Sequence, residues 1–418
     1  MLPIKLIILF NIFTLFIFIT SPYEWNGSNV YLVTAYLGIN YLAIYLGYSL
    51  GLKNNRPKYN PSFLFKNNRK IVRFIYLFYF FTFLIKYAYL LRFEIIDISG
   101  MFKYLLIGIY DPMMGYKLSV NDIRPHTISW LLFTLVSTIN QIFFITGFIF
   151  WKKSKDFTKL VFLIFLIIEL FYWFGRGTGF GITSIISTII AVYIIERKFG
   201  TINFALIGKI TVIGFFAIIS FGYLKTLRAG GEIVNYQNFS HGKAYINESS
   251  EILNIIPSTL TQTYLHSTSY LSQGYYHLGL AFNSTKDFTS TYFFGNNPAT
   301  INIARIFGVE LWERTFMYKL LMEEGIDDYA KWHSAYLWYA NDVSLYGVPF
   351  FLLILSFIFG HSYKEVFYSN DFISKLISVI IFNMLFYLFS NNTYLYHHFY
   401  SLTILLLIWF FTRFNRFV

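Results

Sequence analysis

Apolar stretches of about 20 residues recur along almost the whole of this 418-residue chain. Twenty residues of α-helix are about 30 Å long, which matches the hydrocarbon core of a bilayer. A soluble domain has typically about 25% charged residues, whereas this chain has 13% and a mean hydropathy of +0.52. The stretches therefore predict membrane-spanning helices near residues 4–20, 30–51, 71–91, 129–150, 160–174, 178–195, 204–224, 346–360, 374–390 and 399–412.

Basic residues are concentrated in alternate loops. Residues 52–70, after the second predicted span, contain Lys and Arg but no acidic residue, and basic clusters also follow the fourth, sixth and last spans. Cytoplasmic loops carry such an excess of Lys and Arg. We therefore expect an all-α, polytopic membrane protein with about ten transmembrane helices in a single domain over residues 1–418. Both termini would be cytoplasmic, and residues 225–345 would form a long, partly helical periplasmic loop.

The net charge of +12 is explained by this loop asymmetry, so no nucleic-acid partner is expected. The chain has no cysteine, no HExxH motif and no acidic cluster with the spacing of metal ligands. His266 and His277 are eleven residues apart, about three helical turns, which is too far for joint metal ligation. We therefore predict no metal site and no cofactor.

The stretch FYWFGRGTGFGITS, residues 171–184, places Arg176 among closely spaced glycines between two short predicted spans. The glycines allow a sharp turn and close helix packing. Arg176 could then extend to the membrane surface as part of a packed hairpin. Alternatively, its planar guanidinium could bind a phosphate in a bidentate manner, beside the amino-terminal end of a helix.

Glu169 is an isolated carboxylate inside an apolar stretch, seven residues before Arg176 and so on the same helical face. Ionisable groups at such depth are costly and are usually paired or functional. Glu169 could anchor Arg176, pair with Lys86, or remain a neutral, hydrogen-bonded acid.

The long loop contains most of the other candidate residues. Histidine transfers protons near neutral pH, and tyrosine can offer both a ring and a hydroxyl to a sugar. Residues 264–282, YLHSTSYLSQGYYHLGLAF, are amphipathic and rich in tyrosine, and we expect them to lie along the membrane surface. The basic and titratable residues of the loop are Arg228, His241, His266, His277, Arg305, Arg314 and His333.

Three stretches together resemble the oligosaccharide repeat-unit polymerases, the Wzy or O-antigen polymerase family. They are the glycine-flanked arginine in FGRGTGFG, the loop segment YLSQGYYHLGLAF, and YLWYANDVSLYG at the start of a late span. Ser344 stands where the last motif often has its first glycine, which leaves the role of Asp342 open.

The resemblance implies a metal-independent, membrane-embedded glycosyltransferase of the GT-C type in the bacterial inner membrane. Such an enzyme transfers the growing glycan from undecaprenyl diphosphate to the non-reducing end of a lipid-linked repeat unit at the periplasmic face. Its partners would be that lipid-linked oligosaccharide, membrane lipids and, as a candidate, a chain-length regulator of the Wzz type. The expected catalytic residues are His333, His266 and Glu169, and the expected diphosphate- or glycan-binding residues are Arg176, Arg228, Arg305, Arg314, Tyr270, Tyr275, His277 and Tyr336.

Two alternatives remain. An O-antigen ligase would use the same chemistry but pass the glycan to lipid A-core. A flippase or transporter of lipid-linked oligosaccharide would place charges along a central cavity, whereas here the predicted spans contain few, Lys86, Glu169 and Lys209 among them.

Overall fold

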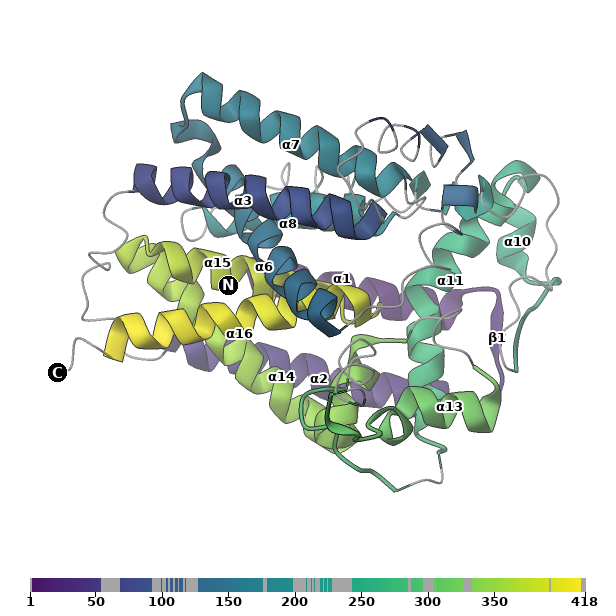
Figure 1. Cartoon of the computed structure of the whole chain (residues 1–418). Coiled ribbons are helices and arrows are strands. Elements are labelled where there is room, and N and C mark those ends of the chain that lie inside the picture. Colours follow the sequence, from purple (N-terminus) through teal and green to yellow (C-terminus); the bar gives the residue numbers. More distant parts are fainter. Residues whose placement is uncertain are drawn as a thin grey trace.

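The fold is mostly helical (Figure 1). The computed structural model describes residues 2–53, 68–91, 127–175, 179–197, 243–284, 287–295, 306–326, 333–390 and 392–414, together with scattered positions between 99 and 117, between 208 and 227, and at 304. The described elements are α1 (Leu2–Thr20), β1 (Tyr23–Trp25), α2 (Val30–Lys53), α3 (Asn68–Leu91), α6 (Thr127–Phe150), η2 (Trp151–Lys153), α7 (Asp156–Gly175), α8 (Phe180–Ile195), β2 (Ala244–Ile246), α10 (Glu251–Ile255), α11 (Ser258–Ala281), η4 (Trp312–Arg314), α13 (Phe316–Glu324), α14 (Ala335–Ser369), α15 (Phe372–Phe386) and α16 (Asn392–Phe414).

Four of these helices, α1, α2, α7 and α14, are long and apolar enough to cross a membrane. Shorter apolar helical stretches lie at Val72–Phe83, Gly181–Ile195, Phe372–Phe386 and His398–Arg413. The helices thus support a membrane-embedded, helical protein, as predicted, and most of the predicted spans coincide with a helix. The span predicted at 204–224 falls largely outside the described residues.

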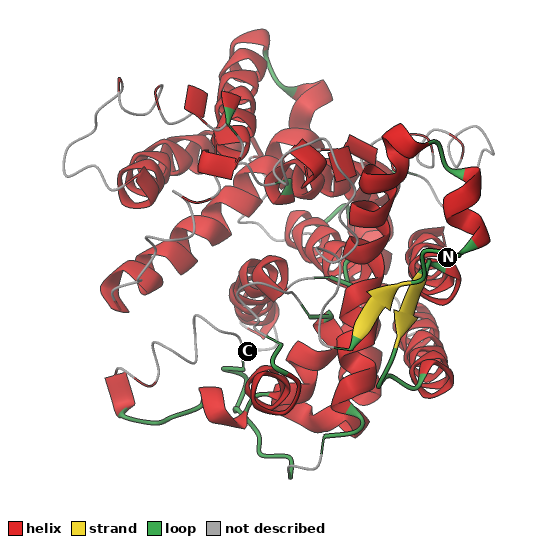
Figure 2. Ribbon diagram, turned by 90° about the vertical axis from the view of Figure 1, so that its right-hand side faces the viewer, coloured by secondary structure: helices red, strands yellow, loops and turns green. Residues whose placement is uncertain are grey.

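The helices of the bundle run roughly alongside one another, and α11 runs across their ends (Figure 1). At that end β1 pairs with β2 in an antiparallel ladder, with Tyr23 opposite Ile246 (Figure 2). The pairing joins the connection between α1 and α2 to the segment before α11. We call this the α11 end of the bundle. The opposite end, where α16 finishes at Phe414, is called the Arg413 end.

The helices α2 and α14 form the closest helix pair, and glycines make their approach possible. A Cβ atom on Gly51 would lie 2.2 Å from the Phe357 carbonyl oxygen, and one on Gly360 would lie 2.2 Å from that of Tyr48. Glycine at such positions lets two backbones touch, as is common in membrane helix pairs. The contact fixes α14, whose first residues carry part of the candidate site.

Helix α14 is kinked near its first third. Ser344 has φ 65° and ψ 165°, outside the helical region, and Pro349 follows five residues later. Proline has no N–H, so it cannot bond to the carbonyl of Leu345 four residues before it. Instead, the Tyr36 hydroxyl donates to that carbonyl oxygen at 2.8 Å.

The start of α14 differs from the prediction, which placed the eighth span at 346–360. The helix begins at Ala335, and residues 335–343 form a first helical stretch before the kink, although Asn341 and Asp342 interrupt its apolar run. The segment 264–282 is helical, but α11 is buried around most of its circumference rather than lying on a surface with one face open.

Candidate functional site

A seam of buried polar side chains lies at the α11 end, where α11 packs against the start of α14. Buried polar groups are usually hydrogen-bonded, so their concentration in one place calls for a structural or functional reason. The buried polar residues of α11 and of the chain that enters α14 include Ser267, Thr268, Ser269, Ser272, Gln273, His277, His333, Ser334 and Asn341.

The chain just before α14 is held tightly in this seam. The Ala335 amide donates to the Leu388 carbonyl oxygen at 3.0 Å. A Cβ on Gly274 of α11 would lie 2.4 Å from the Phe389 carbonyl oxygen and 3.0 Å from the Ser334 amide nitrogen. Only glycine permits this approach, so Gly274 brings α11 directly against residues 333–335.

The approach brings two histidines together. The ring centroids of His277 and His333 are 4.6 Å apart with the rings at 55°, and the residues are 0% and 1% exposed. Neither ring nitrogen of His333 has a hydrogen-bond partner within the described structure. Burial, and then the neighbouring His277 ring, hold the pKa of His333 well below its usual value. His333 is therefore neutral near pH 7, and in this buried position its protonation is unfavourable.

The Tyr276 ring lies beside His277, with the ring centroids 5.5 Å apart, and two further tyrosines of the predicted site are buried in the interior. The hydroxyls of Tyr275 and Thr14 are 2.8 Å apart, and the Tyr275 ring centroid is 6.5 Å from that of Tyr336. Burial raises the pKa of Tyr275 to about 12, so its phenol stays protonated. Both rings are fully buried. They therefore lie in the interior rather than on an open surface of the kind expected for sugar stacking.

His266, the rival base, lies on α11 eleven residues before His277 and is partly buried. That spacing corresponds to about 16 Å along the helix axis. The structure thus pairs His333 with His277, a partnership that sequence reasoning missed. The pair is 56 residues apart in sequence, and no periodicity connects its members; only the close packing at Gly274 does.

Tyr270 faces a separate cavity of about 90 Å³. The cavity lies between α1, α8 and α11, and the Tyr387 hydroxyl in its wall donates to the Thr183 carbonyl oxygen at 3.0 Å. Thr183 belongs to the first turn of α8, directly after the glycine-rich stretch. Tyr270 therefore points toward the part of the fold that the hairpin was expected to occupy.

Of the four arginines predicted to bind diphosphate, the described residues include Arg314. Arg176, Arg228 and Arg305 lie outside the described residues, although α7 ends at Gly175 and α8 begins at Phe180, as the predicted hairpin requires. Arg314 ends η4, and its guanidinium carbon lies 6.0 Å from the centre of the Tyr292 ring.

Glu169 lies in a different cluster, formed by α3, α6 and α7. It is 2% exposed and accepts hydrogen bonds from Trp173 Nε1 at 2.9 Å and Asn140 Nδ2 at 3.4 Å. These contacts agree with the expectation of a hydrogen-bonded acid. They do not place Glu169 beside the histidine pair.

Two residues of the YLWYANDVSLYG motif hold a neighbouring loop. Asp342 Oδ1 accepts from the Thr291 hydroxyl at 2.5 Å and from the Phe293 amide at 2.8 Å. Asn341 Oδ1 accepts from the Phe316 amide at 2.8 Å. The positive φ of Ser344 explains why a glycine suits that position, since serine adopts this region only at a cost.

No group of three or more His, Cys, Asp or Glu side chains that could hold a metal ion occurs within the described ranges. No protein-family model, curated protein or solved structure matches the chain.

Proposed function

We propose that the protein is a membrane-embedded glycosyltransferase that polymerises lipid-linked oligosaccharide repeat units. The observation that carries the proposal is the neutral, buried His333 beside His277 at the α11 end of the bundle. A neutral imidazole with an unpartnered nitrogen can take the proton of an acceptor hydroxyl if the bound substrate, with its leaving diphosphate, offsets the burial that lowers the pKa of His333.

The reaction follows from this role. The acceptor hydroxyl oxygen forms a bond to the anomeric carbon of the donor sugar, and the bond between that carbon and the diphosphate oxygen breaks. His333 takes the hydroxyl proton, and the leaving diphosphate carries the electron pair. Arginines would stabilise its charge; Arg314 is the described member of the predicted set, which also includes Arg176, Arg228 and Arg305. Because His333 is only 1% exposed, the side chains above it must move to admit the acceptor.

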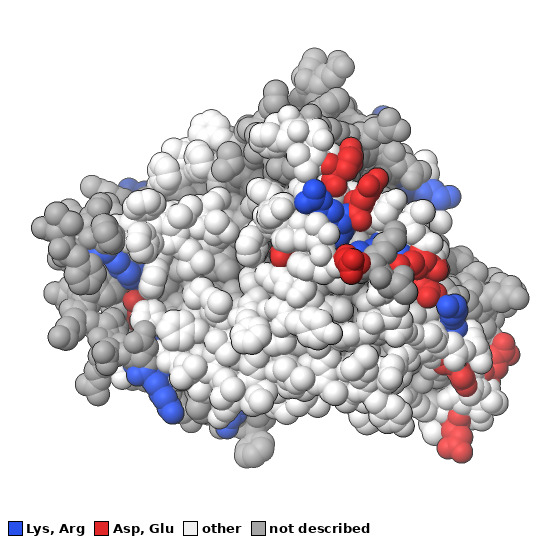
Figure 3. Space-filling view, turned by 90° about the horizontal axis from the view of Figure 1, so that it is seen from below, with Lys and Arg blue, Asp and Glu red and all other residues white. Residues whose placement is uncertain are grey.

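We place the α11 end on the periplasmic side and the Arg413 end in the cytoplasm. In Figure 3, Asp and Glu gather toward one end, where Lys and Arg lie among them, the charged side chains at the other end are mostly Lys and Arg, and the surface between is almost free of charge. The Arg413 end carries Lys53, Lys152, Lys153, Arg197, Lys375 and Arg413, with Glu196, Glu365 and Asp371 in ion pairs there. The α11 end carries fewer cations, Lys243 and Arg314 among them, beside Glu24, Glu251, Glu313, Glu323 and Glu324. This asymmetry supports the orientation, since cytoplasmic segments are rich in Lys and Arg.

An O-antigen ligase would use the same base and leaving group, and a flippase would need neither. The lipopolysaccharide of a strain lacking the gene distinguishes the three. Loss of a polymerase leaves core capped with one repeat unit, and this is the result we expect. Bare core would contradict the proposal and indicate a ligase or a flippase.

A further inference from the structure

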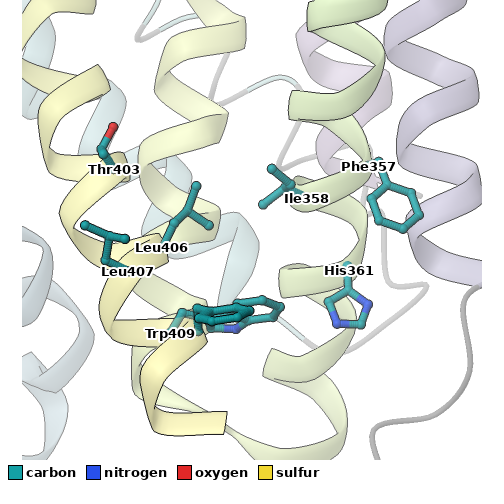
Figure 4. A pocket seen from close by; sticks show the side chains of 8 residues that line it. Phe357, Ile358, His361, Thr403, Leu406, Leu407 and Trp409 are labelled. Carbon is teal, nitrogen blue, oxygen red and sulfur yellow. The ribbon is translucent and has the colours of Figure 1, made fainter. Parts of the chain in front are cut away.

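A lateral groove of about 410 Å³ lies between α14 and α16, near the Arg413 end (Figure 4). Both helices pack against α15 and touch each other only slightly, so a gap remains between them. On its other side α14 packs closely against α2 through Gly51 and Gly360. The groove is lined by Phe357, Ile358, His361, Thr403, Leu406, Leu407, Trp409 and Phe410.

Hydrogen bonds and ion pairs hold the side chains at the end of the groove nearer Arg413. Trp409 and His361 face each other across it, with ring centroids 5.7 Å apart at 87° (Figure 4). Trp409 Nε1 donates to Glu365 Oε2 at 3.0 Å, and Arg413 Nη2 donates to the same oxygen at 2.6 Å. Arg413 also reaches Asp371 at 3.3 Å. This buried ionic cluster fixes the indole, so the groove is a preformed cavity rather than a loose contact.

The mouth of the groove opens onto an apolar surface. Leu407 and Phe410 at the rim are each 53% exposed, and the neighbouring Ile354 of α14 is 58% exposed. In a membrane-embedded helix such side chains face the hydrocarbon of the bilayer. The volume and the apolar lining suit a lipid chain.

We infer that the groove binds one acyl chain of a membrane phospholipid, with its head group toward the Arg413 end. His361 and His333 are separated by 28 positions, most of them in α14, or about 40 Å at the helical rise. A lipid in the groove therefore has its head group at the membrane face opposite the histidine pair. This position excludes the lipid-linked donor, whose diphosphate must lie beside the histidines. The exclusion of the donor rests on the proposed function, whereas the binding of an acyl chain in the groove does not.

Native mass spectrometry of the full chain, extracted from phosphatidylethanolamine and phosphatidylglycerol vesicles, tests the inference. The wild type should retain one phospholipid, and Thr403→Trp, which fills the groove, should lose it. Ile408→Trp is the matched control, because Ile408 is exposed on the same helix but does not line the groove. Retention by Thr403→Trp, equal loss from both variants, or an adduct with the mass of a polyprenyl phosphate would each overturn the inference.

A second measurement does not depend on whether Thr403→Trp folds. Phospholipids with brominated acyl chains quench tryptophans that they touch. The quenched fraction of the fluorescence should fall in Trp409→Phe relative to the wild type, in vesicles of the same composition. An unchanged fraction would mean that no chain reaches the groove.

Discussion

The rings of His277 and His333 lie 4.6 Å apart in the interior of the protein, although the residues are separated by 56 positions in sequence. The pair unites a residue of α11 with the chain that enters α14. A neutral, buried imidazole makes the stability of the fold depend on pH, and this dependence can be measured without a substrate.

Stability should fall as the pH drops below about 6.5. The pKa of His333 is lowered in the folded protein, whereas the unfolded chain binds a proton near the ordinary value. The unfolded state therefore binds more protons between the two values, and folding weakens there by at most about 1.4 kcal/mol per pH unit for this group. Thermal unfolding in detergent at pH 7.5 and 5.5 measures the effect. His333→Gln should show a smaller difference between the two pH values, and an equal difference would contradict the assignment.

The hydroxyl of Tyr36 should contribute to stability through the kink of α14. Tyr36→Phe leaves the Leu345 carbonyl without its donor, because Pro349 cannot supply one. An unsatisfied buried carbonyl costs about 1–3 kcal/mol. Tyr31→Phe, at a residue 89% exposed on the same helix, is the control and should have almost no effect. Similar unfolding temperatures for both variants would show that the bond at the kink is unimportant.

Substitution by alanine should change the free energy of unfolding in opposite directions at two glycines of α2. At Gly51 the added methyl would meet the backbone of α14, and forced overpacking costs about 1–3 kcal/mol. At Gly38 nothing lies within 4 Å of the new atom, so alanine should stabilise the helix by about 0.5–1 kcal/mol. Denaturant unfolding of the two variants tests the pair, and a stabilising Gly51→Ala would rule out the close contact.

Cysteine labelling tests the orientation, since the chain has no cysteine of its own. Tyr245→Cys in β2 should react with a membrane-impermeant maleimide in cells with an intact inner membrane. Lys153→Cys in η2 should react only after the membrane is permeabilised. The reverse pattern would invert the topology.

The sequence predicted the helices well because apolar runs and helical length follow directly from the thickness of a bilayer. It placed the start of α14 too late, since residues 335–343 are helical but contain Asn341 and Asp342. These two residues interrupt the apolar run because they bond to Phe316 and Thr291 of neighbouring segments. It identified His277 and His333 as separate candidates. Their contact depends on how closely α11 packs at Gly274, which is a tertiary property that residue spacing does not contain.

The central claim is that His333 accepts the proton of the acceptor hydroxyl. Its direct test is polymer formation by the purified protein from lipid-linked repeat units, with chelator present, comparing the wild type with His333→Gln and His266→Gln. General-base catalysis contributes about 10²–10⁴-fold, so the turnover of His333→Gln should fall by that factor while the binding of lipid-linked substrate changes little. His266→Gln should retain most of the activity. A normal rate for His333→Gln with a collapsed rate for His266→Gln would assign the base to His266 of α11, and normal rates for both would contradict the account.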